Sequence, residues 1–525
     1  MNPVPSTALP GAPRAPSSGG PHFAIPSRLT PHIQAPRRML VAAVAVGILA
    51  QVLLDREHWG VSFPLVILAT LGALVTLGGR EGWERARPNA WLLGPVLVIA
   101  GFVAVRDSPW LRTLNVLTAS WLMLLLTHFW GGGRVQRLGL GAYPSVVLSA
   151  VGRGLSYPRV LAREAAELAS PGKRLPLLMP VLRGLLFALP VLMVFGVLLG
   201  GADVAFAAAL ERMFDVDIGD FVALSLRNVL GVLLCAATTA GLVGHALRRR
   251  SAVEAGDAEE APSEQWLGIT ESLVLILAVN ALFLAFASFQ VQYLFIGGAS
   301  SPAPGYTYSE YARRGFFELL AVTVMTLGLV MGLARWARRE SPMASRLFQV
   351  GTSVMVVLTL VIVASAMKRL VMYEEAYGYT RLRIFSHVFM VLLGVVLTWR
   401  GVTLWWRPER FAMGAHVAAM AAVMAVNVIN PDALIVRYSA VRSPLVPASW
   451  VDEALLNSLS ADAVPERVKL YSQTSLLRPE LLAASCEPRS WPEWTLSRTL
   501  ACRAFQSVPA AEVSAGGDSR TAPPR

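Results

Sequence analysis

The sequence is poor in charged residues, in cysteine and in the motifs that bind nucleotides or zinc. Only 15% of its 525 residues are charged, whereas soluble proteins carry about 25%. Three cysteines exclude a disulfide-dense scaffold and a cysteine-rich zinc site. The His-Glu-x-x-His, Gly-x-Ser-x-Gly and Gly-x-x-x-x-Gly-Lys patterns are absent. We therefore predict no metal site, and the sequence assigns no cofactor.

Apolar residues are abundant and occur in long runs. They make up 54% of the chain, and the mean hydropathy is +0.53. Several runs are shorter than the ~20 residues of a perpendicular span, so flanking residues must complete them. The pattern predicts an all-α, polytopic transmembrane bundle of about eleven spans, whose only predicted partner is the lipid bilayer. The runs are Met39–Leu54, Val61–Gly78, Ala90–Val105, Val116–Phe129, Gly184–Leu199, Val222–Leu247, Gly268–Phe289, Phe316–Ala334, Phe348–Met367, Ile384–Thr398 and Phe411–Val428.

The net charge of +12 reflects arginines at the ends of these runs. Cytoplasmic loops of membrane proteins are enriched in Lys and Arg, and such residues alternate with the spans along most of this chain. This alternation predicts a cytoplasmic N-terminus and an extracytoplasmic C-terminus. No basic patch interleaved with aromatic residues occurs in a soluble segment, so we predict no nucleic-acid partner.

The composition divides the chain into four parts. Residues 1–37 are rich in Pro, Gly and Ser and are predicted to be a disordered cytoplasmic tail. Residues 38–429 are the transmembrane region, residues 430–506 a small helical extracytoplasmic domain, and residues 507–525 a disordered tail. The pattern Ser490-Trp-Pro-Glu493 predicts a capping box that opens a helix running through Cys502. If this tail lies outside the cytoplasm, Cys486 and Cys502 are expected to form a disulfide; the alternative is two unpaired thiols.

Two polar, aromatic segments are expected at the same membrane face, because two apolar runs separate them. The first extends from Tyr306 to Glu318 and the second from Met372 to Arg383, followed by His387. We expect Glu374 or Glu375 to pair with Arg313 or Arg314, and Glu318 with Arg381 or Arg383, because charges that enter a span usually find partners. The candidate residues of this outer-face cluster are Glu310, Tyr311, Arg313, Arg314, Glu318, Tyr373, Glu374, Glu375, Tyr377, Arg381, Arg383 and His387.

The cluster has two interpretations. It is either a polar pocket, with carboxylates for acid–base chemistry and arginines for an anionic substrate, or an aromatic belt with salt bridges that fix helix ends. Further residues that would line such a pocket are Asn280, Gln290, Gln292, Asn427, Asn430 and Asp432. The sequence identifies no catalytic residue.

Four segments carry a resemblance to a known family. They are Gly305–Leu319, Tyr373–Arg383, Asn430-Pro-Asp432 and Leu459–Pro465. Together they resemble the bacterial membrane family called domain of unknown function 4173, which is close to family 4153, over roughly residues 175–505. The proline-rich N-terminus and the Cys486/Cys502 pair are not features of that family. The resemblance implies a bacterial integral membrane protein, and it implies no activity, cofactor or catalytic residue.

Together these observations favour an uncharacterised, multi-pass protein of the bacterial inner membrane. The leading hypothesis is a non-enzymatic module for envelope signalling or for handling a small solute. The alternative is a membrane-embedded transferase with a polar site at the outer face. Whether the protein is an enzyme is left open by the sequence.

Overall fold

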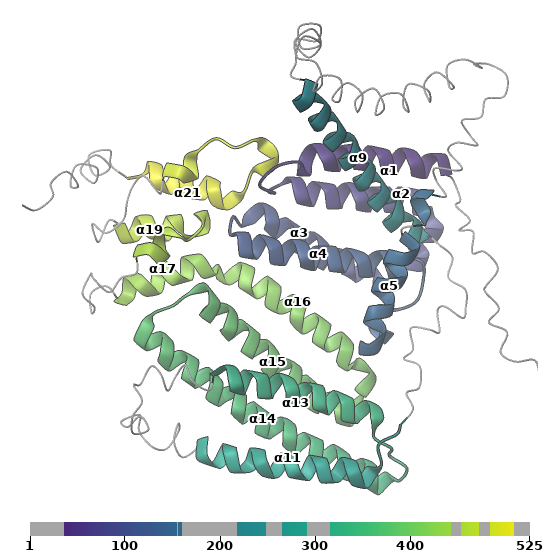
Figure 1. The fold of residues 1–525 in the computed structure, drawn as a ribbon, viewed down its shortest axis with the longest axis vertical. Helices are drawn as coiled ribbons and strands as arrows, with labels where there is room; N and C mark the ends of the chain where they lie inside the picture. Colours follow the sequence, from purple (N-terminus) through teal and green to yellow (C-terminus); the bar gives the residue numbers. More distant parts are fainter. Residues whose placement is uncertain are drawn as a thin grey trace, which may run out of the picture.

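A computed structural model describes residues 36–154, 156–159, 218–247, 265–290, 316–442, 453–471 and 483–508. Within these ranges the chain is helical and forms no named strand, and the only β feature is an isolated bridge between Leu267 and Ala337. Figure 1 shows long, roughly parallel helices stacked side by side, with shorter helices gathered at one end. The protein is an all-α helical bundle of the polytopic membrane type.

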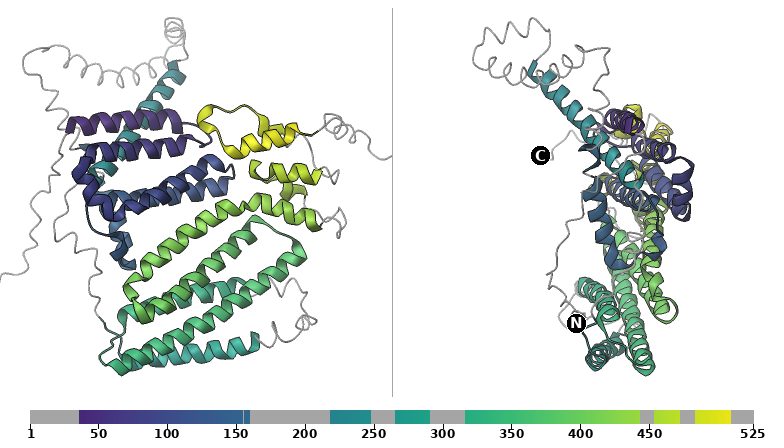
Figure 2. Two further views of the ribbon diagram at one scale, coloured as in Figure 1. Left: turned by 180° about the vertical axis from the view of Figure 1, so that it is seen from behind. Right: turned by 90° about the vertical axis from the view of Figure 1, so that its right-hand side faces the viewer.

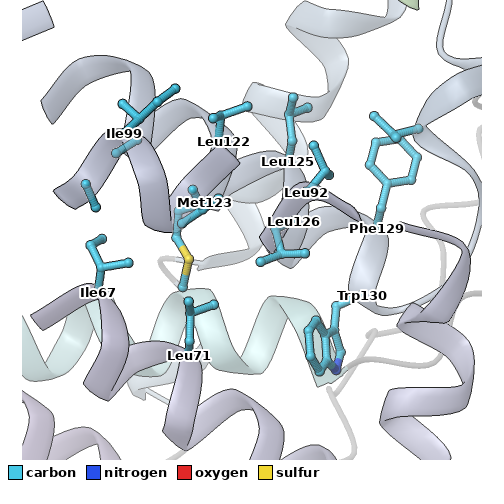
Figure 3. Packing of buried hydrophobic residues seen from close by; sticks show 14 of the residues in the cluster. Ile67, Leu71, Leu92, Ile99, Leu122, Met123, Leu125, Leu126, Phe129 and Trp130 are labelled. Carbon is cyan, nitrogen blue, oxygen red and sulfur yellow. The ribbon is translucent and has the colours of Figure 1, made fainter. Parts of the chain in front are cut away.

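In the part of the chain that the structure describes, the first bundle contains six helices. Its core lies between α2, α3 and α4, where Leu74, Ile99, Leu122 and Leu126 are fully buried. Figure 3 shows leucines of α4 pointing toward Ile67 and Leu71 of α2, with Trp130 closing the core at the end of α4. The helices are α1 (Pro36–Leu54), α2 (Ser62–Ala86), α3 (Leu93–Val105), α4 (Pro109–Trp130), α5 (Tyr143–Gly154) and α9 (Ile218–Leu247), with the 3-10 turns η1 (Arg87–Leu92), η2 (Val135–Arg137) and η3 (Leu140–Ala142).

The second bundle contains five helices among the described residues, with a separate core around Phe348, Met355 and Leu397. The helices are α11 (Ile269–Gln290), α13 (Phe316–Trp336), α14 (Pro342–Tyr377), α15 (Arg381–Trp406) and α16 (Phe411–Ile429); the 3-10 turn η5 (Pro408–Arg410) precedes α16. Ser341 caps α14 by accepting a hydrogen bond from the Ala344 amide (3.1 Å). Gly378 ends α14 with φ of 77°, a conformation that favours glycine.

The C-terminal domain begins where Asn430 adopts a left-handed conformation (φ 54°) and turns the chain from α16 into α17. Figures 1 and 2 agree that α17, α19 and α21 gather at one end of the long helices, beside the α1–α2 and α3–α4 connections. We call this the domain end. The elements are α17 (Pro431–Arg442), α18 (Glu453–Asn457), η7 (Ala461–Ala463), α19 (Val464–Tyr471), η8 (Ala484–Cys486), η9 (Trp491–Glu493) and α21 (Leu496–Gln506).

The membrane-spanning pattern agrees with the sequence prediction. Ten of the eleven predicted apolar runs fall within helices, and the remaining run, Gly184–Leu199, lies outside the described residues. Within the described residues, nine helical stretches are long and apolar enough to cross a membrane. One of them, Ser62–Val105, contains both α2 and α3 and is interrupted by Gly79 at φ 57°. Many large apolar side chains on these helices remain exposed, as expected for surfaces that face lipid.

Candidate functional site: a polar layer at the domain end

An ion pair joins the C-terminal domain to the second bundle. Arg381, the first residue of α15, donates Nε to Oδ1 of Asp432 (2.6 Å) and Nη2 to Oδ2 (2.9 Å). Asp432 is only 2% exposed, and it also accepts the backbone N–H (3.0 Å) and hydroxyl (2.6 Å) of Ser460. The planar guanidinium matches the carboxylate with two parallel hydrogen bonds, which fixes orientation as well as proximity. Arg381 thereby orients α17 against the start of α15.

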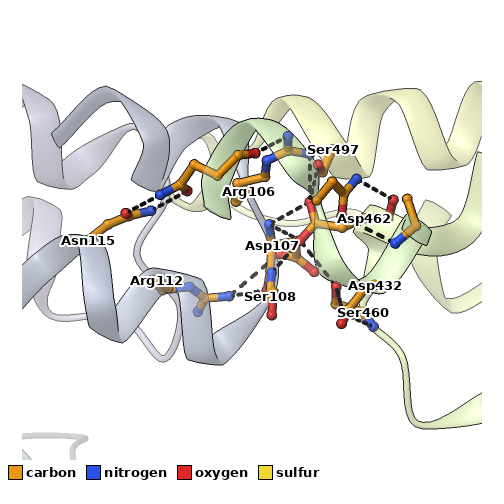
Figure 4. A network of polar contacts seen from close by, with 12 residues as sticks. Arg106, Asp107, Ser108, Arg112, Asn115, Asp432, Ser460, Asp462 and Ser497 are labelled. Atoms are coloured by element: carbon orange, nitrogen blue, oxygen red, sulfur yellow. Dashed lines mark hydrogen bonds and ion pairs between the residues drawn. The ribbon is translucent and has the colours of Figure 1, made fainter. Parts of the chain in front are cut away.

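A second buried carboxylate, Asp462, joins the domain to the first bundle (Figure 4). It accepts the backbone N–H groups of Asp107 (3.1 Å) and Ser108 (2.7 Å), in the short connection between α3 and α4. It also accepts the hydroxyl groups of Ser497 and Ser460, the latter at 3.1 Å. These donors satisfy both buried oxygens of Asp462 with hydrogen bonds. The nearest cation is Arg106, at 3.9 Å.

The network continues into the membrane helices. Asn115 of α4 and Asn427 of α16 exchange two side-chain hydrogen bonds (2.8 and 2.7 Å), and both are fully buried. Arg106 donates to the carbonyl oxygen of Asn427. Because buried amides are costly unless paired, this contact fixes the register of α16 against α4. Asn430 adds a bond from its Nδ2 to the Asp462 carbonyl (3.1 Å).

Charged groups also surround Asp107. Its Oδ1 lies 3.6 Å from both Arg112 Nη2 and Arg489 Nη1, so cations from the membrane helices and the C-terminal domain converge on it. Burial nevertheless raises the pKa of Asp107, outweighing the opposite effects of Arg489 and Arg112. Burial, reinforced by the same two arginines, lowers the pKa of nearby His58. Both shifts in pKa favour the neutral forms of the Asp107 and His58 side chains relative to the same groups in water.

The second predicted polar segment lies at the domain end of α14 and α15. Glu374 is 1% exposed, and its Oε1 lies 3.2 Å from Nδ1 of His387. The guanidinium of Arg383 lies over the Tyr373 ring, 4.3 Å from its centroid. Tyr373 and Tyr377 are in ring contact at 4.9 Å, as their i, i+4 spacing predicts. The carboxylate–imidazole pair is an arrangement able to exchange a proton.

The first predicted segment is only partly described. Glu310, Tyr311, Arg313 and Arg314 lie outside the described residues, and so do their expected contacts with Glu374 and Glu375. Glu318 lies exposed in the first turn of α13.

The predicted pairing of Glu318 with Arg381 or Arg383 is wrong. Arg381 binds Asp432, which is 51 residues along the chain, and Arg383 lies over Tyr373. Arg381 does not continue the helix that carries Tyr373 and Tyr377, because Gly378 ends α14 before it.

The residues expected to line a common pocket are dispersed. Asn427 pairs with Asn115 of the first bundle, and Asn280 donates to the Gly351 carbonyl (2.9 Å). Gln290 accepts from Ser365 (2.8 Å) and from Arg369 (3.3 Å) between α11 and α14. Among the described residues, Asp432 is the member of this set that contacts the predicted cluster, through Arg381. Gln292 lies outside the described residues. The described residues contain no group of three or more His, Cys, Asp or Glu side chains able to hold a metal ion.

Two features of the C-terminal domain were anticipated in part. Cys486 and Cys502 form a disulfide, with Cα atoms 4.8 Å apart. The Ser490–Glu493 capping box is present, with Glu493 accepting the Ser490 N–H (3.3 Å). It opens the 3-10 turn η9 rather than the α-helix, because Trp494 and Thr495 are extended and α21 begins only at Leu496.

Sequence reasoning missed Asp107, Ser108 and Ser497. Asp107 and Asp462 are 355 residues apart, so no local spacing connects them. A buried pair of histidines, His128 of α4 and His245 of α9, was also missed; their Nδ1 and Nε2 atoms are 3.0 Å apart. A signal was available only for Asp432 and Asp462, which both lie in segments that carry the family resemblance.

Comparison with known sequences assigns the family. A sequence profile described as domain of unknown function (DUF4153) matches residues 93–470. The chain belongs to the DUF4153 family. The resemblance noted above was to a related family, 4173, which it placed close to 4153. No curated protein and no solved structure matches the chain. The matched region of DUF4153 runs from the start of α3 to the end of α19, so it contains Asp107, Arg381, Asp432 and Asp462 but excludes α1, α2 and α21.

Proposed function

We propose that this DUF4153 protein is a non-enzymatic signalling module of the cell envelope. In this proposal the C-terminal domain, residues 430–506, responds to a condition outside the cytoplasm and transmits it to the membrane helices. The observation that carries the proposal is the double attachment of one domain to both bundles, through Asp432 to Arg381 and through Asp462 to residues 107 and 108. In this proposal, a displacement of the domain changes its contacts with both bundles.

The proposed orientation places the domain end outside the cytoplasm of a bacterial inner membrane. Arginines lie near the helix ends opposite the domain end: Arg335 is in the last turn of α13, and Arg134 and Arg407 follow α4 and α15. Arg80 directly follows the break at Gly79 in α2. Alkaline phosphatase and a fluorescent protein fused after Phe505, and separately after Tyr306, test this orientation. We expect phosphatase activity at both positions, and fluorescence at either position would contradict it.

Transmission through the domain is tested by a mild change at Ser497. Ser497→Ala removes one donor from Asp462, and Thr499→Ala on the same helix is the matched control outside the network. Amide hydrogen exchange is measured at residues 381–387, on the other bundle. A signalling module predicts faster exchange there for Ser497→Ala and not for Thr499→Ala. Unchanged exchange at residues 381–387 for both variants would mean that the domain is a passive cap.

The Glu374–His387 pair supports a second candidate, a membrane-embedded transferase that uses the pair for general acid–base chemistry. Glu374→Gln should then abolish product formation while the protein remains folded. Glu375→Gln on the exposed side of the same turn is the control. Mass spectrometry of membrane lipids and lipid-linked sugars, from cells expressing each variant, is the measurement. Identical profiles for wild type and Glu374→Gln would exclude this candidate.

A further inference from the structure

The C-terminal domain carries an apolar surface that the described residues leave exposed. It comprises Trp491, Trp494, Leu496 and Leu500, of which the two tryptophans are 64% and 46% exposed. A neighbouring side of α21 is buried through Ser497 and Ala501 against the rest of the domain. Four large apolar side chains exposed within ten residues form an interaction surface rather than the scattered exposure seen on soluble domains. We call these four residues the Trp491–Leu500 surface.

The position of this surface is fixed by contacts with the first bundle. The backbone N–H of Val61 donates to the carbonyl oxygen of Trp494 (3.0 Å), directly before α2 begins at Ser62. A Cβ atom on Gly60 would clash with the backbone of Glu493 and Trp494, so these two segments of the chain are in close contact. In Figures 1 and 2 α21 lies beyond the adjacent ends of α1 and α2. The surface therefore begins at the level where two membrane spans end.

Other tryptophans occupy the same level. Trp110 lies in the first turn of α4 and is 66% exposed. Trp59 lies in the α1–α2 connection and donates its indole N–H to the Leu54 carbonyl (3.0 Å) at the end of α1. Tryptophan is enriched at membrane–water interfaces because its ring is apolar while its N–H seeks a polar partner. The pattern at the domain end is that of an interfacial belt to which the C-terminal domain contributes two rings.

We propose that the Trp491–Leu500 surface is a lipid-binding surface that seats the C-terminal domain on the headgroup region of the bilayer. The occupant is the bilayer itself, because the surface continues the level at which α1 and α2 leave the hydrocarbon. In this arrangement the domain is held from two sides, by the Asp432 and Asp462 contacts and by insertion of indole rings among the lipids. This inference is independent of the signalling proposal, since a passive domain would be seated in the same way.

The test measures the immersion depth of labelled positions in the full-length protein in nanodiscs of phosphatidylcholine and phosphatidylglycerol. Cys235 is replaced by Ala, and single cysteines are introduced as Trp491→Cys, Trp494→Cys and Gln506→Cys. Cys486 and Cys502 are bonded to each other and do not react with a maleimide spin label. Gln506 is the matched control, because it lies ten residues beyond Leu496 on the same helix, about 15 Å away.

Collision of the spin labels with oxygen and with a nickel chelate distinguishes the outcomes. We expect labels at 491 and 494 to show a several-fold higher ratio of oxygen to nickel accessibility than the label at 506. Equal ratios at all three positions would overturn the proposal, because the surface would then face water. Labels at 491 and 494 that are shielded from both reagents would also overturn it, because a protein surface, such as a second copy of the chain, would then cover it. The intact Cys486–Cys502 disulfide on non-reducing gels confirms that each labelled variant has folded.

Discussion

The C-terminal domain is attached to the second bundle by an ion pair and to the first bundle by backbone amides. Asp432 accepts hydrogen bonds from the guanidinium of Arg381, and rotation of the Arg381 side chain would break them. Asp462 has the N–H groups of Asp107 and Ser108, whose positions are set by the connection between α3 and α4. Moving those donors requires the connection itself to move, so the attachment to the first bundle is the stiffer of the two. We therefore expect the Asp462 contacts to hold the domain more rigidly than the Arg381–Asp432 ion pair does.

The largest effect is expected from Asp462→Ala, which removes the stiffer attachment. Two backbone donors and the Ser497 hydroxyl lose their acceptor, and each unsatisfied buried group costs about 1–3 kcal/mol. We expect a loss of roughly 3 kcal/mol or more in the free energy of unfolding, measured by denaturant titration in detergent. Asp462→Asn should cost less, because the amide oxygen still accepts. Equal stability of wild type and Asp462→Ala would contradict the role given to this residue.

The next effect is expected from Cys486→Ser combined with Cys502→Ser, which loosens the domain without touching either attachment. The bridge closes a loop with a sequence separation of 16, for which the loop-closure model predicts about 3 kcal/mol. The loss should appear as earlier thermal unfolding of the domain. A reducing agent should destabilise wild type by the same amount and leave the double variant unchanged.

A smaller effect is expected at the ion pair between Arg381 and Asp432. Arg381→Ala, Asp432→Asn and the double variant form a cycle, and we expect a coupling free energy of about 2 kcal/mol from unfolding measurements. Arg381→Lys should recover only part of it, since an ammonium cannot form two parallel hydrogen bonds. A coupling free energy near zero would mean that Arg381 and Asp432 do not hold the domain to the second bundle.

The pH dependence of stability sharpens the comparison at Asp107. Burial raises the pKa of this carboxyl in the folded protein above its ordinary value of about 3.8. At pH values between the ordinary and the raised pKa, the folded state therefore binds more protons than the unfolded state. Its contribution is therefore favourable at low pH and is lost as the pH rises through this range. Asp107→Asn should flatten that part of the profile of unfolding free energy against pH. A steeper profile in the variant would contradict the raised pKa assigned to Asp107.

The smallest effect is expected at an exposed ion pair, Asp55 with Arg227, which joins the α1–α2 connection to α9 at 3.1 Å. Both side chains are substantially solvated, so the pair should contribute less than about 0.5 kcal/mol. Asp55→Asn thus serves as the control for the buried carboxylates in the same unfolding assay. A loss comparable to that of Asp462→Ala would show that burial is not what distinguishes them.

The spans were predictable from sequence because membrane helices satisfy their own backbone and need only an apolar surface. The site was less predictable, because its partners are distant in the chain. Arg381 was among the predicted cluster residues, but its partner Asp432 could be matched to it only once Asn430 was known to turn α17 back over α15. Asp462 lies between Ala461 and Ala463, and these neighbours give no sign of a buried site. Its donors are backbone amides, which leave no trace in the pattern of side chains.

Glu374 and His387 show how a break in a helix conceals a contact. They are 13 residues apart, a separation that brings no two side chains together on a continuous helix. Gly378 ends α14 and allows α15 to return alongside it, so the two helices present the pair face to face. Glycine at this position was visible in the sequence, but the path of the chain after it depends on the packing of α15 against α14.

The central claim, that Asp462 holds the domain against the first bundle, is tested most directly by amide hydrogen exchange at Asp107 and Ser108. In the folded protein both amides donate to Asp462. We predict slow exchange at these two positions in wild type and fast exchange in Asp462→Ala, with the Val61 amide, which donates to Trp494, as an internal reference for domain docking. Fast exchange at Asp107 and Ser108 in wild type, or exchange unaffected by the substitution, would contradict the account.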